Sequence, residues 1–205
     1  GHPVRGIVVP NLHQYHHLGD ASTETDNLQY NASLKSYESN GASSGTLDDR
    51  WAFTNRSSFL DYRTAGALAS ASRALKGYND ALSAKCLDIA LKLFNEANEI
   101  EKKAKPDNSP MSRWTKGSDM IALLQLYIST KEDQYKTGFL NKIWKSLDED
   151  VERNMNSALL ALSSMDNDYK VKLRSYAVKY KAKIDKDNAD NPYGVPLVKR
   201  GWGGT

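Results

Sequence analysis

Acidic and hydroxyl side chains are concentrated at residues 18–26, in the segment Leu-Gly-Asp-Ala-Ser-Thr-Glu-Thr-Asp. Carboxylates and hydroxyls form strong hydrogen bonds with polar ligands, and two facing carboxylates can act as acid and base. Two such pairs are conceivable, Asp20 with Asp26 and Asp26 with Asp49. The segment therefore indicates a polar binding loop, with a solvated loop as the alternative.

Aromatic side chains near turn-forming residues are a second candidate group, because an aromatic ring offers a flat apolar face to a ligand or to a core. Trp202 lies between glycines, which let a backbone approach a ligand closely. Trp51 follows three charged residues and belongs either to the edge of a cleft or to a core. Trp114 and Trp144 lie at or near expected helices, and we predict structural roles for them.

Three histidines raise the question of a metal site. His13 and His17 are four residues apart, so one helical face would present both, with His16 beside them. The segment has no His-Glu-x-x-His pattern, and Pro10 and Gly19 disfavour a helix there. We predict neither a metal nor another cofactor.

Composition excludes several classes of protein. The chain has 205 residues, 40% hydrophobic and 26% charged, with a formal net charge of +3. That charge is too small and too dispersed to indicate nucleic-acid binding, and no apolar run is long enough to span a membrane. Cys86 is the only cysteine, so an internal disulfide is excluded, and its apolar helical setting predicts a buried thiol.

The chain divides into three zones. Residues 1–58 are rich in loops, with a possible short strand at Ile7-Val8-Val9 for which no partner is obvious. Residues 59–186 show apolar positions at helical spacing, and residues 187–205 are rich in glycine and proline. The predicted fold class is all-α, built from antiparallel helical hairpins.

About six helices are expected within residues 59–186. Small residues at 65–70 should allow one helix pair to approach closely, and Lys-rich residues 170–186 should form a solvated face. The signals expected at the helix ends are Gly77, Asn79-Asp80, Pro106 with Pro110, Ser118-Asp119, a turn at 130–133 and Asp166-Asn167. The fifth helix is expected to cover residues 148–163.

An ordered set of segments resembles family 9 of the glycoside hydrolases. Residues 18–26 look like that family's Val-Gly-Asp-Gly loop, and residues 64–73 look like its Ala/Ser-rich helix. Residues 86–94 resemble the next helix, while 191–196 and 201–203 resemble a loop of a bacterial branch. Together these matches cover most of the chain.

The resemblance implies an (α/α)6 toroid that hydrolyses β-1,4-linked glucans with inversion. Such chemistry needs an acid and a base about 6.5–9.5 Å apart. The family's base lies in an Asp-Ala-Gly-Asp segment, which this sequence lacks, and its acid is a Glu near the end of the domain. We therefore expect residues 1–205 to be an internal part of a catalytic domain, with no catalytic residue of its own and no activity in isolation.

The resemblance also suggests substrate contacts. In related cellulases the loop supplies a His and a Trp, near which this chain has Thr25 and Asn27, so that stacking contact is expected to be lost. The candidate substrate-binding residues are Asp20, Thr25, Asp26, Trp51, Tyr193 and Trp202.

The expected partners are a polysaccharide or oligosaccharide and the remainder of the catalytic domain, with neither nucleic acid nor membrane. The parent would be secreted or periplasmic, its signal lying upstream. Two alternatives stay open: a self-contained enzyme using one of the Asp pairs, and a non-catalytic helical module that binds carbohydrate or another protein.

Overall fold

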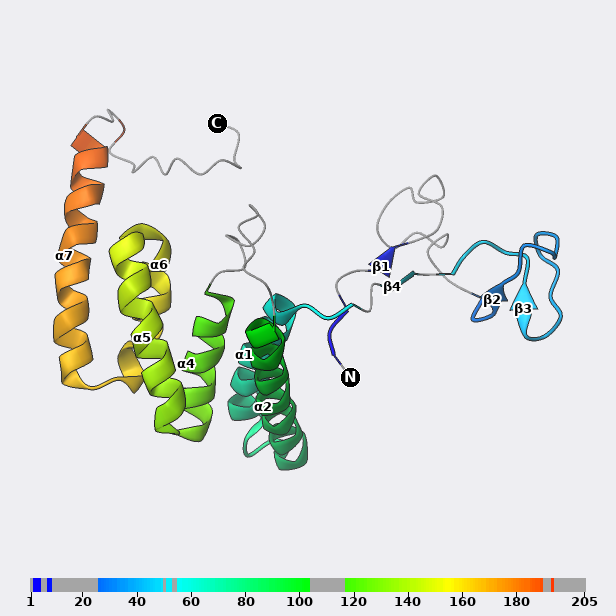
Figure 1. The fold of residues 1–205 in the computed structure, drawn as a ribbon, viewed down its shortest axis with the longest axis horizontal. Helices are drawn as coiled ribbons and strands as arrows, with labels where there is room; N and C mark the ends of the chain where they lie inside the picture. The colour runs from blue at the N-terminus through cyan, green and yellow to red at the C-terminus, as the bar shows by residue number, and fades with distance from the viewer. Residues whose placement is uncertain are drawn as a thin grey trace. The chain divides into compact units, whose positions relative to one another are not determined.

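The computed structural model describes residues 2–4, 7–8, 26–49, 51–52, 55–103, 117–189 and Tyr193. The chain forms two compact units, Gly1–Asp61 and Tyr62–Thr205. Short strands and loops make up the described part of the first unit, and helices make up most of the described part of the second (Figure 1).

The first unit contains two small sheets. Strand β1 (Ile7–Val8) pairs antiparallel with β4 (Trp51–Ala52), so that Val8 lies opposite Trp51. Strand β2 (Gln29–Tyr30) pairs in parallel with β3 (Ser43–Ser44). The strand expected at residues 7–9 thus exists, and it does have a partner. That partner is remote in the sequence, which is why local pattern did not reveal it.

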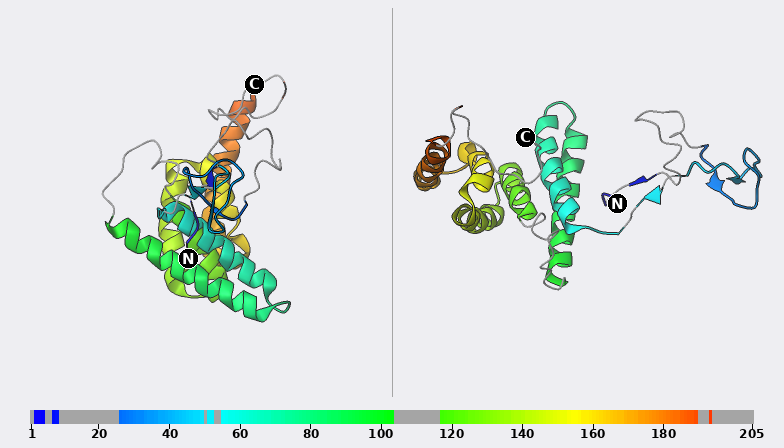
Figure 2. Two further views of the ribbon diagram at one scale, coloured as in Figure 1. Left: turned by 90° about the vertical axis from the view of Figure 1, so that its right-hand side faces the viewer. Right: turned by 90° about the horizontal axis from the view of Figure 1, so that it is seen from above.

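The described residues contain six α-helices, which confirms the all-α prediction (Figures 1 and 2). Consecutive helices pack together, α4 on α5, α5 on α6 and α6 on α7. The helices are α1 (Ser58–Leu75), α2 (Asp80–Lys103), α4 (Ser118–Thr130), α5 (Asp133–Glu149), α6 (Val151–Leu159) and α7 (Asn167–Ala189).

Side chains and glycines at the helix ends explain most of these boundaries. Gly77 has a φ of +85°, which ends α1, and the Asn79 Oδ1 accepts a hydrogen bond from the Leu82 N–H at the start of α2. Asp166 Oδ1 accepts from the Tyr169 N–H at 3.0 Å and starts α7. The predicted cap at Ser118-Asp119 is wrong, since the N-cap is Gly117, with a φ of +83°.

The fifth helix differs most from prediction. In place of one helix over 148–163, α5 extends to Glu149 and α6 covers only Val151–Leu159. Asp150 is extended, and its Oδ1 accepts from the Arg153 N–H, so its side chain starts a new helix. A 3-10 turn, η3 (Leu162–Ser164), follows α6. The Asp150 cap therefore starts the fifth helix at Val151, later than the expected start at 148, and the expected helix does not continue as α-helix beyond Leu159.

The core of the helical unit is formed by apolar residues that repeat at helical spacing. Phe139, Ile143 and Leu124 are fully buried, and Cys86 is also buried, as predicted. Trp144 packs on Tyr169 and stacks on Tyr176 with ring centroids 5.8 Å apart, which agrees with its predicted structural role. Not every apolar residue at helical spacing is buried, since Leu82, Leu159 and Val171 are exposed. The remaining buried hydrophobic residues are Tyr62, Ala65, Ala69, Ala90, Leu93, Phe94, Ala97, Met120, Ala122, Leu123, Leu126, Tyr135, Leu147, Met155, Ala158, Ala161, Met165, Tyr169, Leu173 and Tyr176.

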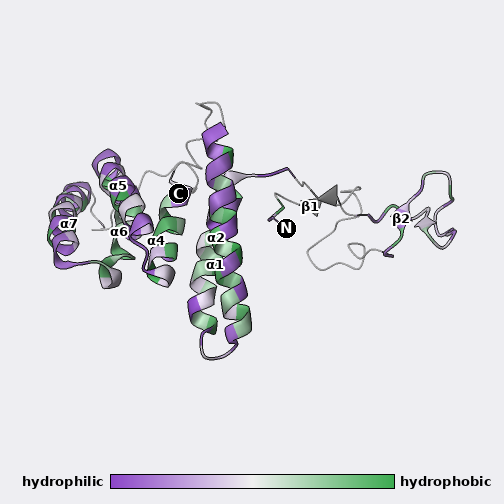
Figure 3. Cartoon of the chain, turned by 60° about the horizontal axis from the view of Figure 1, so that its bottom comes forward, coloured by the Kyte–Doolittle hydropathy of each residue, from purple (hydrophilic) through white to green (hydrophobic). Residues whose placement is uncertain are grey.

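Hydropathy differs strongly between the helices (Figure 3). Helix α4 is the most hydrophobic, and α7 is the most hydrophilic, as its Lys-rich sequence predicts. Among the described residues, no helix is both long enough and apolar enough to cross a membrane.

Helices α1 and α4 approach closely, as the small residues of α1 predict. A Cβ on Gly66 would lie 3.4 Å from the Cα of Ala122. Arg73 reinforces this contact, because it donates to the carbonyl of Ala69 on α1 and to the carbonyl of Gln125 and the hydroxyl of Ser129 on α4. Partial burial lowers the pKa of the Arg73 guanidinium.

Candidate functional site

The candidate substrate-binding residues fall in very different places. Asp20, Thr25 and Trp202 lie outside the described residues, as do the histidines at 13, 16 and 17 and Trp114. Trp51 lies in β4, and Tyr193 is 87% exposed in a turn. Asp26 begins the described loop at 26–49 and is exposed. Of the six candidates, Asp26, Trp51 and Tyr193 thus lie among the described residues.

Carboxylates close the loop at 26–49. Asp48 Oδ2 accepts a hydrogen bond from the Asp26 N–H at 2.7 Å, and Asp49 Oδ2 accepts from the Tyr30 N–H at 2.6 Å. Asp26 Oδ1 accepts from the Leu28 N–H at 2.8 Å, in the manner of an Asx turn. These bonds join the two ends of the loop.

The hypothesis of a local acid–base pair gains no support from this geometry. An inverting pair must face one another across a space that admits water. Asp26 and Asp49 instead each direct an oxygen at a backbone N–H of the loop. Asp48, which the sequence analysis did not select, is the third carboxylate of this arrangement, and its Oδ1 is buried without a hydrogen-bond partner.

Asp61 is the most deeply buried carboxylate among the described residues. It lies in the first turn of α1, where the positive end of the helix dipole favours a negative charge. Arg56 donates to Asp61 Oδ2 through Nε at 3.1 Å and Nη2 at 2.7 Å, while Oδ1 is buried with no hydrogen-bond partner. In the sequence, the signal for this pair is an Arg five residues before an Asp at the start of a helix. The pair ties the residues just before α1 to the first turn of that helix.

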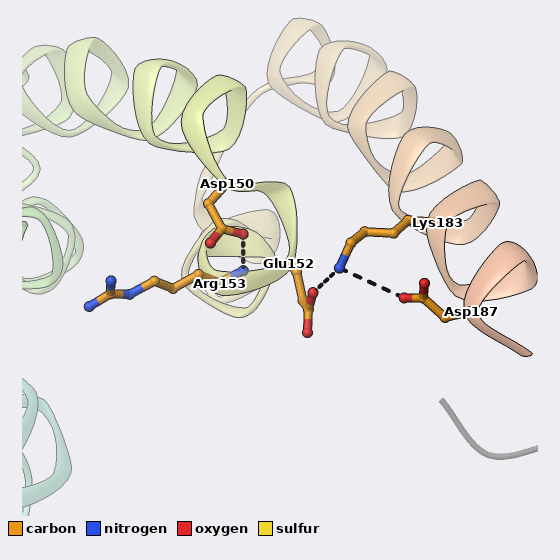
Figure 4. A network of polar contacts seen from close by, with 5 residues as sticks. All are labelled: Asp150, Glu152, Arg153, Lys183 and Asp187. Atoms are coloured by element: carbon orange, nitrogen blue, oxygen red, sulfur yellow. Dashed lines mark hydrogen bonds and ion pairs between the residues drawn. The ribbon is translucent and has the colours of Figure 1, made fainter. Parts of the chain in front are cut away.

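A groove of about 450 Å³ lies where α5, α6 and α7 meet. Its walls combine carboxylates and lysines with two apolar residues, and Figure 4 shows the charged group around Lys183. The lining residues are Leu147, Asp148, Glu149, Asp150, Val151, Glu152, Lys179 and Lys183.

The charged groups of this groove largely satisfy one another. Lys183 pairs with Glu152 and lies 3.8 Å from an oxygen of Asp187, and the hydrogen bond to Glu152 raises the pKa of Lys183. Tyr176 donates its hydroxyl to Asp148 Oδ1 at 2.8 Å, which raises the pKa of that phenol. The bonds from Lys183 to Glu152 and from Tyr176 to Asp148 therefore hold α7 against α6 and α5. Nowhere in the described ranges do three or more His, Cys, Asp or Glu side chains form a group that could hold a metal ion.

Comparison with protein families decides what this helical chain is. The family model described as "Glycosyl hydrolase family 9" matches residues 12–203, nearly the whole chain. The chain belongs to glycosyl hydrolase family 9. No curated protein was found to match it.

Membership of family 9 confirms the resemblance read from the ordered segments. The hairpins between Ser58 and Ala189 are part of the (α/α)6 fold of that family. The family also makes the parent protein a glycoside hydrolase and gives a carbohydrate as the substrate class.

Proposed function

We propose that this chain builds part of the catalytic domain of an inverting hydrolase of β-1,4-linked glucans. The observation that carries the proposal is the family 9 match over residues 12–203, together with the helical hairpins. In this proposal residues 1–205 belong to one catalytic domain, which is completed by further chain. The enzyme is secreted or periplasmic, because polysaccharides are too large and polar to reach the cytoplasm unaided.

The acid and the base of the reaction are proposed to lie outside this chain. No Asp-Ala-Gly-Asp segment occurs among the 205 residues. Three carboxylates of the loop at 26–49, those of Asp26, Asp48 and Asp49, accept hydrogen bonds from backbone N–H groups. The chain therefore supplies scaffold and substrate contacts, and the remainder of the domain supplies proton transfer.

Assays of hydrolysis test this proposal. We expect the pure 205-residue chain to release no reducing sugar from carboxymethylcellulose, xyloglucan or mixed-linkage β-glucan. For the parent enzyme, proton NMR of the first product should show the α-anomer, which reports inversion at a β-linked centre. A β-anomer would contradict inversion, and hydrolysis of starch alone would contradict the β-glucan substrate.

Turnover by the 205-residue chain would instead favour a self-contained enzyme. In that event Asp26→Asn and Asp49→Asn identify whether the proposed local pair is responsible. The asparagine side chain keeps an acceptor oxygen for the Leu28 or Tyr30 N–H, so each variant removes the charge while the loop contact remains.

The proposed substrate contacts are Asp20, Thr25, Asp26, Trp51, Tyr193 and Trp202. Trp202 and Tyr193 carry aromatic faces and are the most informative to change. Replacing either by alanine should weaken binding of cellohexaose by the chain, as measured by calorimetry, with the circular dichroism spectrum unchanged. Unaltered affinity in both variants would remove these two residues from the site.

A further inference from the structure

Tyr37 occupies a backbone conformation that its residue type disfavours. It has a φ of +71°, and the Glu38 N–H donates to the Lys35 carbonyl at 2.9 Å, which makes residues 35–38 a hydrogen-bonded turn. Turns with a positive φ at the third position favour Gly or Asn, because a larger side chain crowds the backbone. The other non-glycine residues with positive φ in the described ranges are Asn27 and Lys131, and Lys131 is the cap of α4.

Contacts around the turn hold this conformation in place. The Gly45 N–H donates to the Glu38 carbonyl at 2.9 Å, and the Lys35 N–H donates to Glu38 Oε2 at 3.1 Å. Gly45 lies so close to the turn that a Cβ there would be 2.0 Å from the Lys35 carbonyl oxygen. The backbone of the loop therefore fixes where the Tyr37 side chain emerges.

The Tyr37 ring gains nothing by burial that would offset this strain. The residue is 92% exposed, the second most exposed of the large hydrophobic residues in the described ranges. Lys35 and Glu38 flank it, with their charged ends 4.0 Å apart and side chains 88% and 53% exposed. The turn thus presents an aromatic face beside a hydrogen-bond donor and an acceptor, all open to solvent.

We propose that Tyr37 is a stacking platform for a pyranose ring of a β-linked glucan, flanked by Lys35 and Glu38. In β-linked glucose the hydroxyls are equatorial, so the two faces of the ring carry axial C–H groups and are apolar. An aromatic π-face attracts such groups, and charged side chains at its edge bind the equatorial hydroxyls. A turn with a fixed backbone keeps the platform ordered before the sugar binds, which lowers the entropy lost on binding. This inference rests on the proposed function, because it takes a glucan as the ligand.

Tyr78 supplies a matched control within the same chain. It is 93% exposed and lies in the turn between α1 and α2, yet its φ is not positive. Exposure alone would make the two tyrosines equivalent. Tyr37 differs from Tyr78 in its positive φ and in the ion pair that Lys35 and Glu38 form within its turn.

The test is affinity electrophoresis of the 205-residue chain in gels containing xyloglucan or hydroxyethylcellulose, with calorimetry against cellohexaose. We expect Tyr37→Ala to weaken binding about fivefold or more, the size of one aromatic contact. Tyr37→Trp should keep the affinity, and Tyr78→Ala should leave it unchanged. Tyr37→Gly removes the ring and relieves the strained turn, so it should lose affinity while its thermal midpoint stays the same or rises.

Several outcomes would overturn the platform. They are equal affinity for Tyr37→Ala and the unchanged chain, an equal loss in Tyr78→Ala, full affinity in Tyr37→Gly, or no binding of any of the three glucans by the unchanged chain. None of these results bears on hydrolysis by the parent enzyme or on the anomer that it releases. The platform and the proposed function can therefore fail separately.

Discussion

At the scale of the residue, several of the described carboxylates accept hydrogen bonds from backbone N–H groups at turns and helix starts. Asp26 and Asp49 do so in the loop, while Asp150 and Asp166 do so at the starts of α6 and α7. Each fixes a local bend at a point where the chain changes direction. Acidic residues at this kind of position identify turns and helix starts more reliably than they identify catalysis.

Asp166 combines such a cap with an ion pair. A hydrogen bond from the Lys136 ammonium, at 2.8 Å, and a second from the Tyr169 N–H lower the pKa of Asp166 below its ordinary value of 3.8. The same pair raises the pKa of Lys136. A depressed carboxyl pKa means that the unfolded chain binds protons more readily, so folding stability rises with pH through the acid range.

Asp166→Asn should make folding less stable at neutral pH, because the variant keeps the cap and loses the charge. The difference from the unchanged chain should be complete above about pH 5 and vanish as pH falls through the folded pKa of Asp166. It should shrink again at high pH, when Lys136 loses its proton. Urea unfolding between about pH 2.5 and 11 measures this profile.

Asp185→Asn is the control for that experiment. Asp185 pairs with Lys181 at 2.6 Å, but both side chains are exposed and belong to one helix. Such pairs contribute little to stability, so the variant should follow the unchanged chain at every pH. A flat difference for Asp166→Asn across the pH range would show that its ion pair does not stabilise the fold.

At the scale of the element, two helical glycines lie where one helix packs on another, and they differ in the room around them. On α1, a Cβ added to Gly66 would meet the Cα of Ala122 at 3.4 Å, an ordinary contact. On α5, a Cβ added to Gly138 would meet two methyl groups of Leu123 at 3.0 Å and 3.3 Å. The first site has room for a methyl group, and the second requires a core leucine to move.

Gly66→Ala should therefore raise the free energy of unfolding by about 0.5–1 kcal/mol, the gain in helix propensity. Gly138→Ala should gain less or lose stability, because displacement of the buried Leu123 opposes the same propensity term. Urea denaturation of both variants beside the unchanged chain measures the contrast. An equal gain at both positions would contradict the packing described for Leu123.

At the scale of the whole molecule, no disulfide can constrain the two compact units, since Cys86 is the single cysteine. Its thiol is buried on the apolar face of α2, together with Ala90 and Leu93. Stability of the molecule therefore comes from packing, hydrogen bonds and ion pairs. The thermal midpoint should be the same with and without reductant.

Cys86 should also report opening of the helical unit. We expect negligible reaction with Ellman's reagent in the native chain and one thiol per chain in urea, because the thiolate must reach solvent to react. Cys86→Ala provides the blank. Rapid labelling under native conditions would show that the face of α2 carrying Cys86 is accessible.

Local patterns determined a large part of this fold. Apolar spacing in the sequence located the helices now labelled α2, α4, α5 and α7, and Gly77 and Asn79 marked the turn between α1 and α2, because these features act through neighbours in the chain. The ordered family segments added the glycoside hydrolase class, which the family match confirms. The sequence also predicted a break between the fourth and fifth helices at residue 148, and the structure places that break at Asp150.

Only tertiary structure decided which distant groups meet. The pairing of Val8 with Trp51, the bonds from Arg73 to α4 and the closing of the 26–49 loop by Asp48 all join residues far apart in sequence. The positive φ of Tyr37 occurs in a turn that packs directly against the backbone of Gly45. Gly45 lies eight residues further along the chain, so the local sequence around residue 37 does not predict this contact. Periodicity fixes the face of a helix, whereas the partner of that face is chosen by the packing of the whole chain.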